Sequence, residues 1–207
     1  TRAVPASDPV GPNLVNVTNA AELSAALANA APGDVIELAN GTYAGTFSLD
    51  ASGLDDFPIV IRGASQDGVI LDGQGCDPCN VLEVYGSFVH VERLTIAHAS
   101  RGLRFQGAGA ESNVVRRVKM TDVTLGIGSK SGQRDFYLCD NDLTGRLVWP
   151  QVYTDDGGAH ANDDGIHVEG LGHVICHNRL LGFGDAMKVE QDGALSVDFY
   201  GNEVLSA

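Results

Sequence analysis

The 207-residue sequence is poor in aromatic residues, in basic residues and in long apolar runs. Aromatic residues make up 6% of it, and 13 basic residues face 27 acidic ones, which gives a formal net charge of −14. An acidic surface repels nucleic acid and anionic lipid, so we expect neither nucleic acid nor a membrane as a partner. No run of about 18 apolar residues occurs, so no transmembrane helix is expected.

Glycine and small aliphatic residues are abundant instead. The chain has 26 Gly, and 43% of its residues are hydrophobic. This composition favours a core of Val, Ile, Leu and Ala built from short strands, within a single domain over residues 1–207. Residues 1–16 carry no hydrophobic signal core and begin at Thr1, as expected of the start of a mature secreted or periplasmic protein.

A strand-like segment recurs along the chain. Its copies lie at 80–86, 101–107, 125–132, 164–170 and 185–191, each with a small residue followed by alternating apolar and polar positions. The equivalent apolar positions are Leu82, Leu103, Ile127, Ile166 and Met187, spaced by 21, 24, 39 and 21 residues. The long step contains an inserted loop, 145–161. Such a period predicts a parallel β-solenoid in which each turn stacks on the previous one.

A second ladder has the same spacing. Asn141, Asn178 and Asn202 each follow a short strand, 37 and 24 residues apart, and we expect them to hydrogen-bond to one another at a tight bend. Cys139 and Cys176 are also 37 residues apart, so they stack on adjacent turns as a disulfide or as two buried thiols. The pair Cys76 and Cys79 is interpreted as a local disulfide that closes a loop.

We expect different structures at the two ends of the solenoid. Residues 17–33 are predicted to form a capping helix, with Asn19 as N-cap, Glu22 three residues later and a stop at Pro32-Gly33. The coils then occupy residues 34–207. The last residues, "YGNEVLSA", end within a turn, so we expect further β-helix coils or a partner chain at that edge.

These features resemble the pectin-lyase-like right-handed parallel β-helix superfamily. Residues 17–75 are similar to the N-terminal part of polysaccharide lyases of the chondroitinase B and alginate lyase type. The segment 162–189 resembles the polygalacturonases in layout: Asn162, Asp164, Asp185 and Lys188 fall on that family's positions, whereas its second paired Asp is Ala186 here. The resemblance implies an all-β right-handed parallel β-helix with a short N-terminal helix.

Strand alternation selects the candidate site. With Ile166 and Val168 facing inwards, His167 and Glu169 face outwards, and Lys188 and Glu190 do so one turn later. Earlier turns add two basic side chains to the same face, and the inserted loop supplies two aromatics that would overhang it: Arg104, Lys130, Trp149 and Tyr153. We expect these four to bind substrate. Alternatively, the two aromatic side chains pack the loop against the solenoid. The outward polar side chains would then form only a solvated surface.

Three functions fit this face. A polysaccharide lyase would use His167 and Lys188 as base and acid, with Glu169 and Glu190 as ligands of a Ca²⁺ ion. A glycoside hydrolase would use Asp164 and Asp185, provided that the two carboxylates stand about 6.5–9.5 Å apart. A non-catalytic glycan-binding or structural module is the third. For the lyase, the hydrolase and a glycan-binding module, the expected ligand is a polysaccharide.

Overall fold

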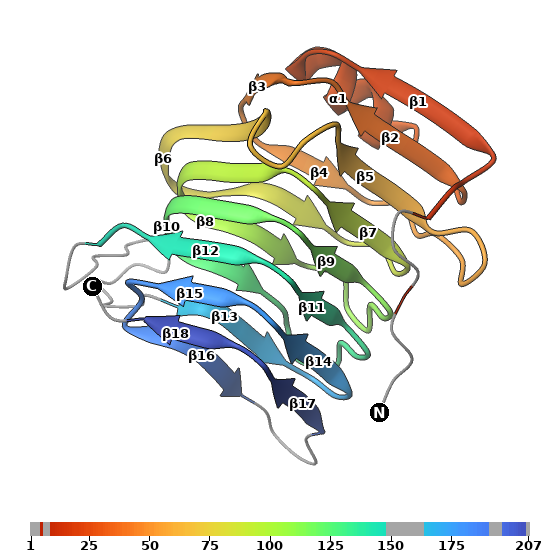
Figure 1. Ribbon diagram of the computed structural model, residues 1–207. Helices are drawn as coiled ribbons and strands as arrows, with labels where there is room; N and C mark the ends of the chain where they lie inside the picture. Colours follow the sequence, from red (N-terminus) through yellow and green to blue (C-terminus); the bar gives the residue numbers. More distant parts are fainter. Residues whose placement is uncertain (1–4, 6–8, 148–163, 191–195, 206–207) are drawn as a thin grey trace.

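The computed structural model describes residues 5, 9–147, 164–190 and 196–205. These residues wind through about seven turns of a right-handed parallel β-helix, as the repeat predicts, with one short helix near the N-terminus (Figure 1). Every pairing between its named strands is parallel, because each strand lies over the equivalent strand of the turn before it.

The described strands form two sheets. The eight-stranded sheet contains, in order, β1 (Asn13–Val17), β2 (Asp34–Leu38), β5 (Ile59–Gly63), β7 (Val89–Glu92), β9 (Val114–Arg116), β11 (Tyr137–Cys139), β14 (His173–Cys176) and β17 (Val197–Tyr200). The ten-stranded sheet runs from β3 (Gly41–Ala44) through β6 (Val69–Val84), β8 (Thr95–Phe105), β10 (Lys119–Gly128), β12 (Asp142–Gly145) and β15 (Arg179–Leu181) to β18 (Glu203–Leu205).

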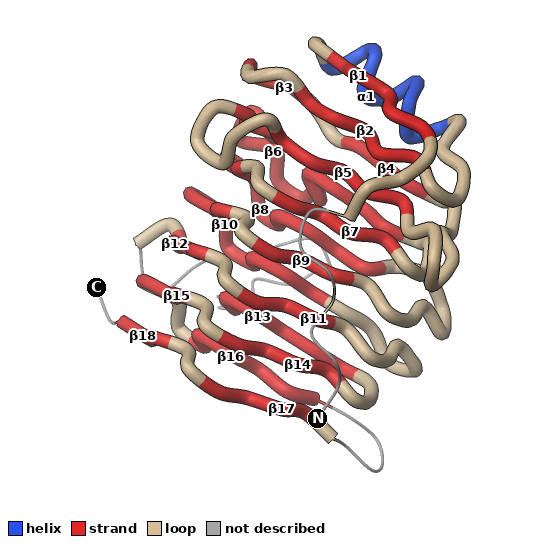
Figure 2. Tube along the Cα trace, turned by 45° about the vertical axis from the view of Figure 1, so that its right-hand side comes forward, coloured by secondary structure: helices blue, strands red, loops and turns tan. Residues whose placement is uncertain are grey.

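Three further strands branch from the ten-stranded sheet: β4 (Phe47–Leu49), β13 (Asp164–Glu169) and β16 (Asp185–Glu190). β4 and β13 pair with the C-terminal parts of β6 and β10, and β16 pairs with β13, whereas β3 and β12 pair with the N-terminal parts of β6 and β10. The long strands β6, β8 and β10 therefore contribute to two faces of the solenoid. Figure 2 shows the stacked turns in a view rotated by 45° from that of Figure 1. The candidate site lies on the face formed by β4, β13, β16 and these C-terminal parts.

The core is a stack of aliphatic side chains. Leu82 pairs with Leu103, Leu103 with Ile127 and Ile127 with Ile166, and each of these residues is at most 1% exposed. Burying one such side chain stabilises the fold by roughly 1.5–3 kcal/mol. The last predicted member, Met187, pairs with Ile166 but is only partly buried, and the next inward residue, Val189, is 41% exposed. Within the described residues β16 is the end of this face, so no later turn covers it.

The asparagine ladder turns the chain from the eight-stranded sheet into the next face. Asp140, His177 and Gly201 adopt left-handed backbone conformations with φ of 60°, 53° and 66°, and an Asn follows each of them. The Asn141 amide donates to the Asn178 side-chain oxygen at 2.9 Å, and the Asn178 amide donates to that of Asn202 at 2.9 Å. This confirms the ladder that the spacing predicted.

Helix α1 (Ala20–Ala28) covers the N-terminal end of the core with Leu23 and Leu27, which are 1% and 2% exposed. It is shorter than the predicted 17–33 because Val17 completes β1 and Asn29 already caps the last turn. Asn19 is the N-cap and accepts a hydrogen bond from the Glu22 amide at 3.0 Å. The Glu22 carboxylate accepts hydrogen bonds from the backbone N–H and the hydroxyl of Thr18, and these bonds lower the pKa of Glu22.

Both cysteine pairs form disulfides. Cys76–Cys79 closes a loop within β6, and Cys139–Cys176 joins β11 to β14 at the register position that the 37-residue spacing predicted. The described helix is neither long nor apolar enough to cross a membrane.

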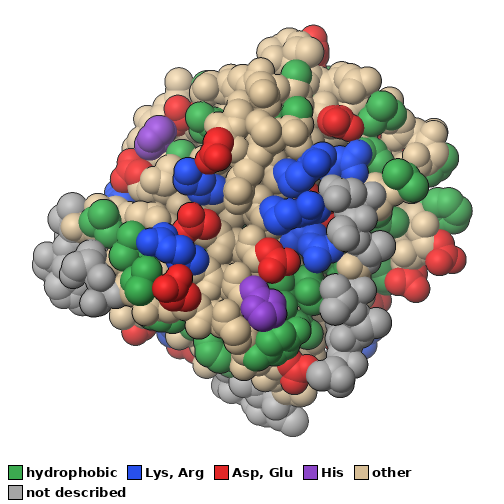
Figure 3. Space-filling view, viewed as in Figure 1, with side chains coloured by type: hydrophobic (Ala, Val, Ile, Leu, Met, Phe, Trp, Pro, Cys, Tyr) green, Lys and Arg blue, Asp and Glu red, His purple; other side chains and the backbone are tan. Residues whose placement is uncertain are grey.

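Residues near the N-terminus contact the outer face of the eight-stranded sheet. The guanidinium of Arg62 donates to the Pro9 carbonyl at 3.4 Å, and that of Arg116 donates to the Pro5 carbonyl at 3.2 Å. Figure 3 shows Lys and Arg side chains gathered on this side of the molecule. The basic side chains of this sheet are therefore partly used by the protein's own backbone, and the candidate site lies on a different face.

Candidate functional site

One outward column runs down the face of β4, β6, β8, β10, β13 and β16. Its members are paired from turn to turn, and they are Ser48, Glu83, Arg104, Gly128, His167 and Lys188. Glu169 pairs with Glu190 two residues further along the last two strands. The register therefore brings His167, Lys188, Glu169 and Glu190 together on the surface, as alternation predicted.

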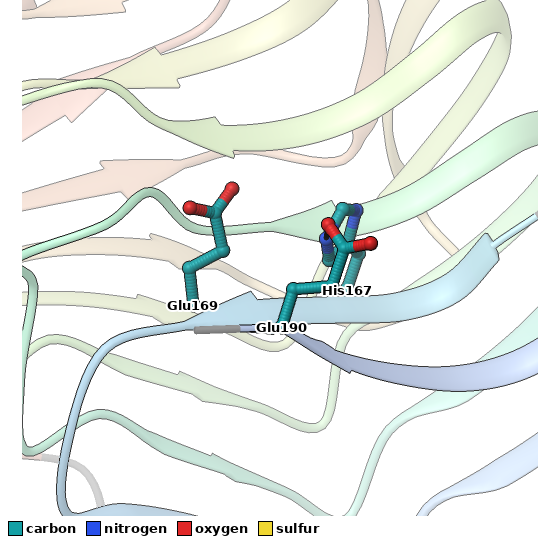
Figure 4. A group of neighbouring side chains, drawn as sticks. All are labelled: His167, Glu169 and Glu190. Carbon is teal, nitrogen blue, oxygen red and sulfur yellow. Dashed lines mark hydrogen bonds and ion pairs between the residues drawn. The ribbon is translucent and has the colours of Figure 1, made fainter. Parts of the chain in front are cut away.

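His167 lies between two carboxylates. Its Nδ1 is 3.2 Å from Asp164 Oδ2, and its Nε2 is 3.2 Å from Glu190 Oε2. The Asp164 side chain is only 4% exposed, whereas that of Glu190 is 52% exposed. Figure 4 shows the His167 and Glu190 side chains close together, with Glu169 beside them. The imidazole thus has a buried carboxylate beside one nitrogen and an exposed carboxylate beside the other.

Glu169 is positioned by the preceding turn. Its backbone N–H donates to the Ser129 hydroxyl at 2.8 Å, and the Ser129 hydroxyl donates to the Glu169 carbonyl at 3.0 Å. Ser129 is 1% exposed, so this pair of bonds is shielded from water and fixes the end of β13. The Glu169 carboxylate is therefore not needed to hold the strand, and its side chain is partly exposed.

Lys188 and Glu190 form an ion pair on β16. Lys188 Nζ is 2.9 Å from Glu190 Oε1. The hydrogen bond to Glu190 raises the pKa of Lys188, and the charges of Asp164, Glu190 and Asp185 add to this rise while burial opposes it. The same hydrogen bond lowers the pKa of Glu190, with a further contribution from His167. At neutral pH Lys188 is therefore a cation and Glu190 an anion.

Arg104 reaches towards His167 because the intervening residue is glycine. A Cβ atom at position 128 would lie 2.6 Å from Arg104 Nη1 and 2.9 Å from Arg104 Cδ, so the guanidinium occupies the space that a side chain would fill. Burial lowers the pKa of Arg104, and the negative charges of Glu169, Asp164 and Glu83 oppose this fall. Its buried Nε has no hydrogen-bond partner among the described residues.

The other predicted site residues are placed less centrally. Asp185 pairs with Asp164 across the turn but is exposed, and Lys130 is exposed just beyond the end of β10. Trp149, Tyr153 and Asn162 lie outside the described residues. Their proposed contacts with substrate stay predictions.

The donor set at the centre of the site is His167, Glu169 and Glu190, whose ligand atoms all lie within 4.8 Å of one another. Ca²⁺ takes six to eight oxygen ligands in proteins. Two carboxylates and an imidazole fall short of that number, and Glu190 already bonds to Lys188. The set therefore fits Ca²⁺ poorly, and we assign no chemical step to a metal. Calcium binding through Glu169 and Glu190 stays a prediction.

Sequence reasoning missed several contributors. The space at Gly128 that Arg104 occupies was not foreseen, and Ser129 was not considered. Asn80 and Arg101 were overlooked although they are 21 residues apart, the repeat itself, and pair across β6 and β8. Their common period with Glu83 and Arg104 was the signal that would have found them.

Comparison with solved structures places this architecture in a known fold class, the pectin-lyase-like parallel β-helix. An alginate lyase from Paenibacillus sp. str. FPU-7 matches with a TM-score of 0.52 at 17% identity, over 94% of this chain and 97% of that one. Pectate lyase Pel9A matches with a TM-score of 0.53 at 16% identity, over 95% of this chain and 71% of that one.

A third structure, the PL6-family polysaccharide lyase Pedsa3628 from Pseudopedobacter saltans, matches with a TM-score of 0.54 at 14% identity. The match covers 80% of this chain and 46% of that one. No protein-family profile matches the sequence, and no curated protein matches it. At these identities the comparisons establish the fold, and function must be argued from the site.

Proposed function

We propose that this protein is a secreted polysaccharide lyase that cleaves a uronate-containing chain by β-elimination in the groove lined by residues 164–190. The observation that carries the proposal is His167, held by the buried Asp164 at 3.2 Å and flanked by Lys188 on the next turn. The similar folds of an alginate lyase and a pectate lyase support the substrate class. Two disulfides are typical of proteins in oxidising compartments.

His167 is the proposed base. Asp164 Oδ2 lies 3.2 Å from Nδ1, so the carboxylate would favour the tautomer with the proton on Nδ1, which leaves Nε2 to take the proton from C5 of the uronate. The contact between Nε2 and Glu190 must open for a sugar to approach. Glu190 has a second partner in Lys188 at 2.9 Å, which holds the carboxylate when that contact opens.

Arg104 is the proposed partner of the uronate carboxylate. Neutralising that carboxylate makes the C5 proton more acidic, and a guanidinium can bind both of its oxygens. Arg104 lies two turns before His167, and its guanidinium occupies the space above Gly128, the residue that pairs with His167. Its buried Nε has no partner among the described residues. Its location beside the base suits this role.

Lys188 is the proposed acid. Its raised pKa keeps the ammonium protonated, so it can donate a proton but not abstract one. In the proposed step the C5–H bond electrons form the C4=C5 double bond, the C4–O4 bond breaks, and the leaving oxygen takes a proton from Lys188. His167 then releases the C5 proton to solvent and Lys188 takes a proton back from solvent, so the reaction needs no other reactant.

The net charge of −14 opposes binding of a polyanion, but the repulsion is local. At physiological ionic strength charges are screened over about 8 Å. Within the groove Arg104, Lys130 and Lys188 supply positive charge, with Glu169 and Glu190 among them. A chain with partly esterified or interspersed neutral residues would meet the least repulsion.

The test is ultraviolet absorbance of the unsaturated product, measured with alginate, polygalacturonate and chondroitin sulfate. We expect activity on at least one of them, with loss of about 10²-fold or more in His167→Ala and Lys188→Ala. Asp185→Ala is the matched control, because it removes an exposed carboxylate from the same strand. Release of reducing ends without absorbance, and its loss in Asp185→Ala, would establish a hydrolase instead. Binding without cleavage would leave a glycan-binding module.

A further inference from the structure

A cavity lies at the N-terminal end of the same face, away from His167. It has a volume of about 460 Å³, within the range of about 300–1,000 Å³ of small-molecule sites, and is bounded by β4 and the Cys76–Cys79 loop of β6. The lining residues that matter here are Phe47, Ser48, Pro78, Asn80, Glu83 and Arg101. None of the proposed catalytic residues lines it.

The cavity is continuous with the outward column. Ser48 pairs with Glu83, which pairs with Arg104, which in turn pairs with Gly128 beside His167. Glu83 is thus three turns above His167, a separation of about 14 Å at the usual spacing between strands. A saccharide chain lying along the column from His167 would reach this cavity.

The Glu83 carboxylate is held in place by three donors. The Asn80 amide donates to Oε1, the Gln106 amide donates to Oε1 at 3.3 Å, and the Tyr85 hydroxyl donates to Oε2 at 3.1 Å. The bond from Tyr85 also raises the pKa of its phenol, as expected beside an ionised carboxylate. Arg101 donates to the Asn80 side-chain oxygen at 3.3 Å. The result is a fixed acceptor next to a fixed cation.

The chemistry of this pair suits sugar hydroxyls. A carboxylate accepts from one hydroxyl while a guanidinium or amide donates to its neighbour, and the exposed Pro78 offers apolar surface to the ring. Because one carboxylate and one guanidinium balance, the cavity carries little net charge and does not demand a charged sugar. We propose that it is a distal subsite that binds a sugar residue through vicinal hydroxyls. The inference rests on the proposed function only in taking a polysaccharide as the ligand.

The experiment separates binding from cleavage by using the His167→Ala variant. Calorimetry measures its affinity for hexasaccharides of alginate, polygalacturonate and cellulose. We expect at least one to bind, and the affinity to fall at least about tenfold when Glu83→Gln is added, since a bond to a charged group is lost. Thr46→Trp, which fills the cavity from an exposed position, should do the same without changing a charge.

Glu203→Gln, at an exposed edge strand remote from this cavity, is the matched control and should leave the affinity unchanged. Circular dichroism checks that each variant is folded. The subsite is refuted if no hexasaccharide binds, or if Glu83→Gln and Thr46→Trp bind as tightly as the parent. A wild-type protein without absorbance change on any polymer, whose hexasaccharide binding depends on Glu83, would refute the lyase and support the subsite.

Discussion

The asparagine ladder gives a stability prediction that does not depend on function. Asn178 is 1% exposed and uses its whole amide: its oxygen accepts from the backbone and side chain of Asn141 at 3.0 and 2.9 Å, and its nitrogen donates to the Leu138 carbonyl at 2.8 Å and to Asn202 at 2.9 Å. Asn178→Ala therefore leaves two buried backbone groups, the Asn141 N–H and the Leu138 carbonyl, without these partners. At about 1–3 kcal/mol each, the free energy of unfolding should fall by about 2–6 kcal/mol.

The measurement is equilibrium unfolding in urea without reductant, followed by circular dichroism and tyrosine fluorescence so that any departure from two-state behaviour is visible. Asn202→Ala is the control. Asn202 makes an equivalent set of bonds, but at a partly exposed position where water can replace them, so its loss should be about 1 kcal/mol. Equal losses in the two variants, or a loss under about 1 kcal/mol in Asn178→Ala, would refute this account of the ladder.

Three further predictions concern the candidate site. Gly128→Ala should raise KM for a uronate polymer about tenfold by displacing the Arg104 guanidinium, and should have no added effect in an Arg104→Ala background, as a double-mutant cycle would reveal. Glu190 raises the pKa of the acid Lys188, so the alkaline limb of the pH–kcat profile should appear where the pH rises through that raised pKa. Glu190→Gln should move this limb to lower pH. A profile that does not move would contradict the assignment of Lys188 as the acid. If Ca²⁺ binds, calorimetry should detect it, and Glu169→Gln should weaken it about tenfold or more; an unchanged affinity would exclude that carboxylate as a ligand.

The fold was predictable because a solenoid repeats its constraints. Leu82, Leu103, Ile127 and Ile166 were aligned from spacing alone, and the structure pairs them in that order even across the inserted loop. Each turn must place an aliphatic side chain over that of the previous turn. Every repeat of the sequence therefore indicates, independently of the others, how its strand aligns with its neighbour. The resemblance to polysaccharide lyases in residues 17–75 pointed to the fold class that the structural comparisons also find.

The site was predictable only in part. Alternation placed His167 and Lys188 side by side, but it could not show that Asp164 would contact His167 Nδ1. By parity Asp164 belongs to the inward side with Ile166, and it is indeed buried; its contact with the imidazole depends on rotamers at the start of the strand. Similarly, a glycine in a column of polar residues gives no sign of which neighbour fills its space, so the approach of Arg104 required coordinates.

The Cys139–Cys176 disulfide has a consequence for how the chain withstands cleavage. Cys139 precedes the inserted loop 145–161 and Cys176 follows it, so the bond joins the segments on either side of that loop. A protease that cut once between them would produce two fragments that still migrate as one molecule until a reductant is added. The strands that carry His167 and Lys188 would then remain docked on the turns that carry Arg104, even in nicked protein.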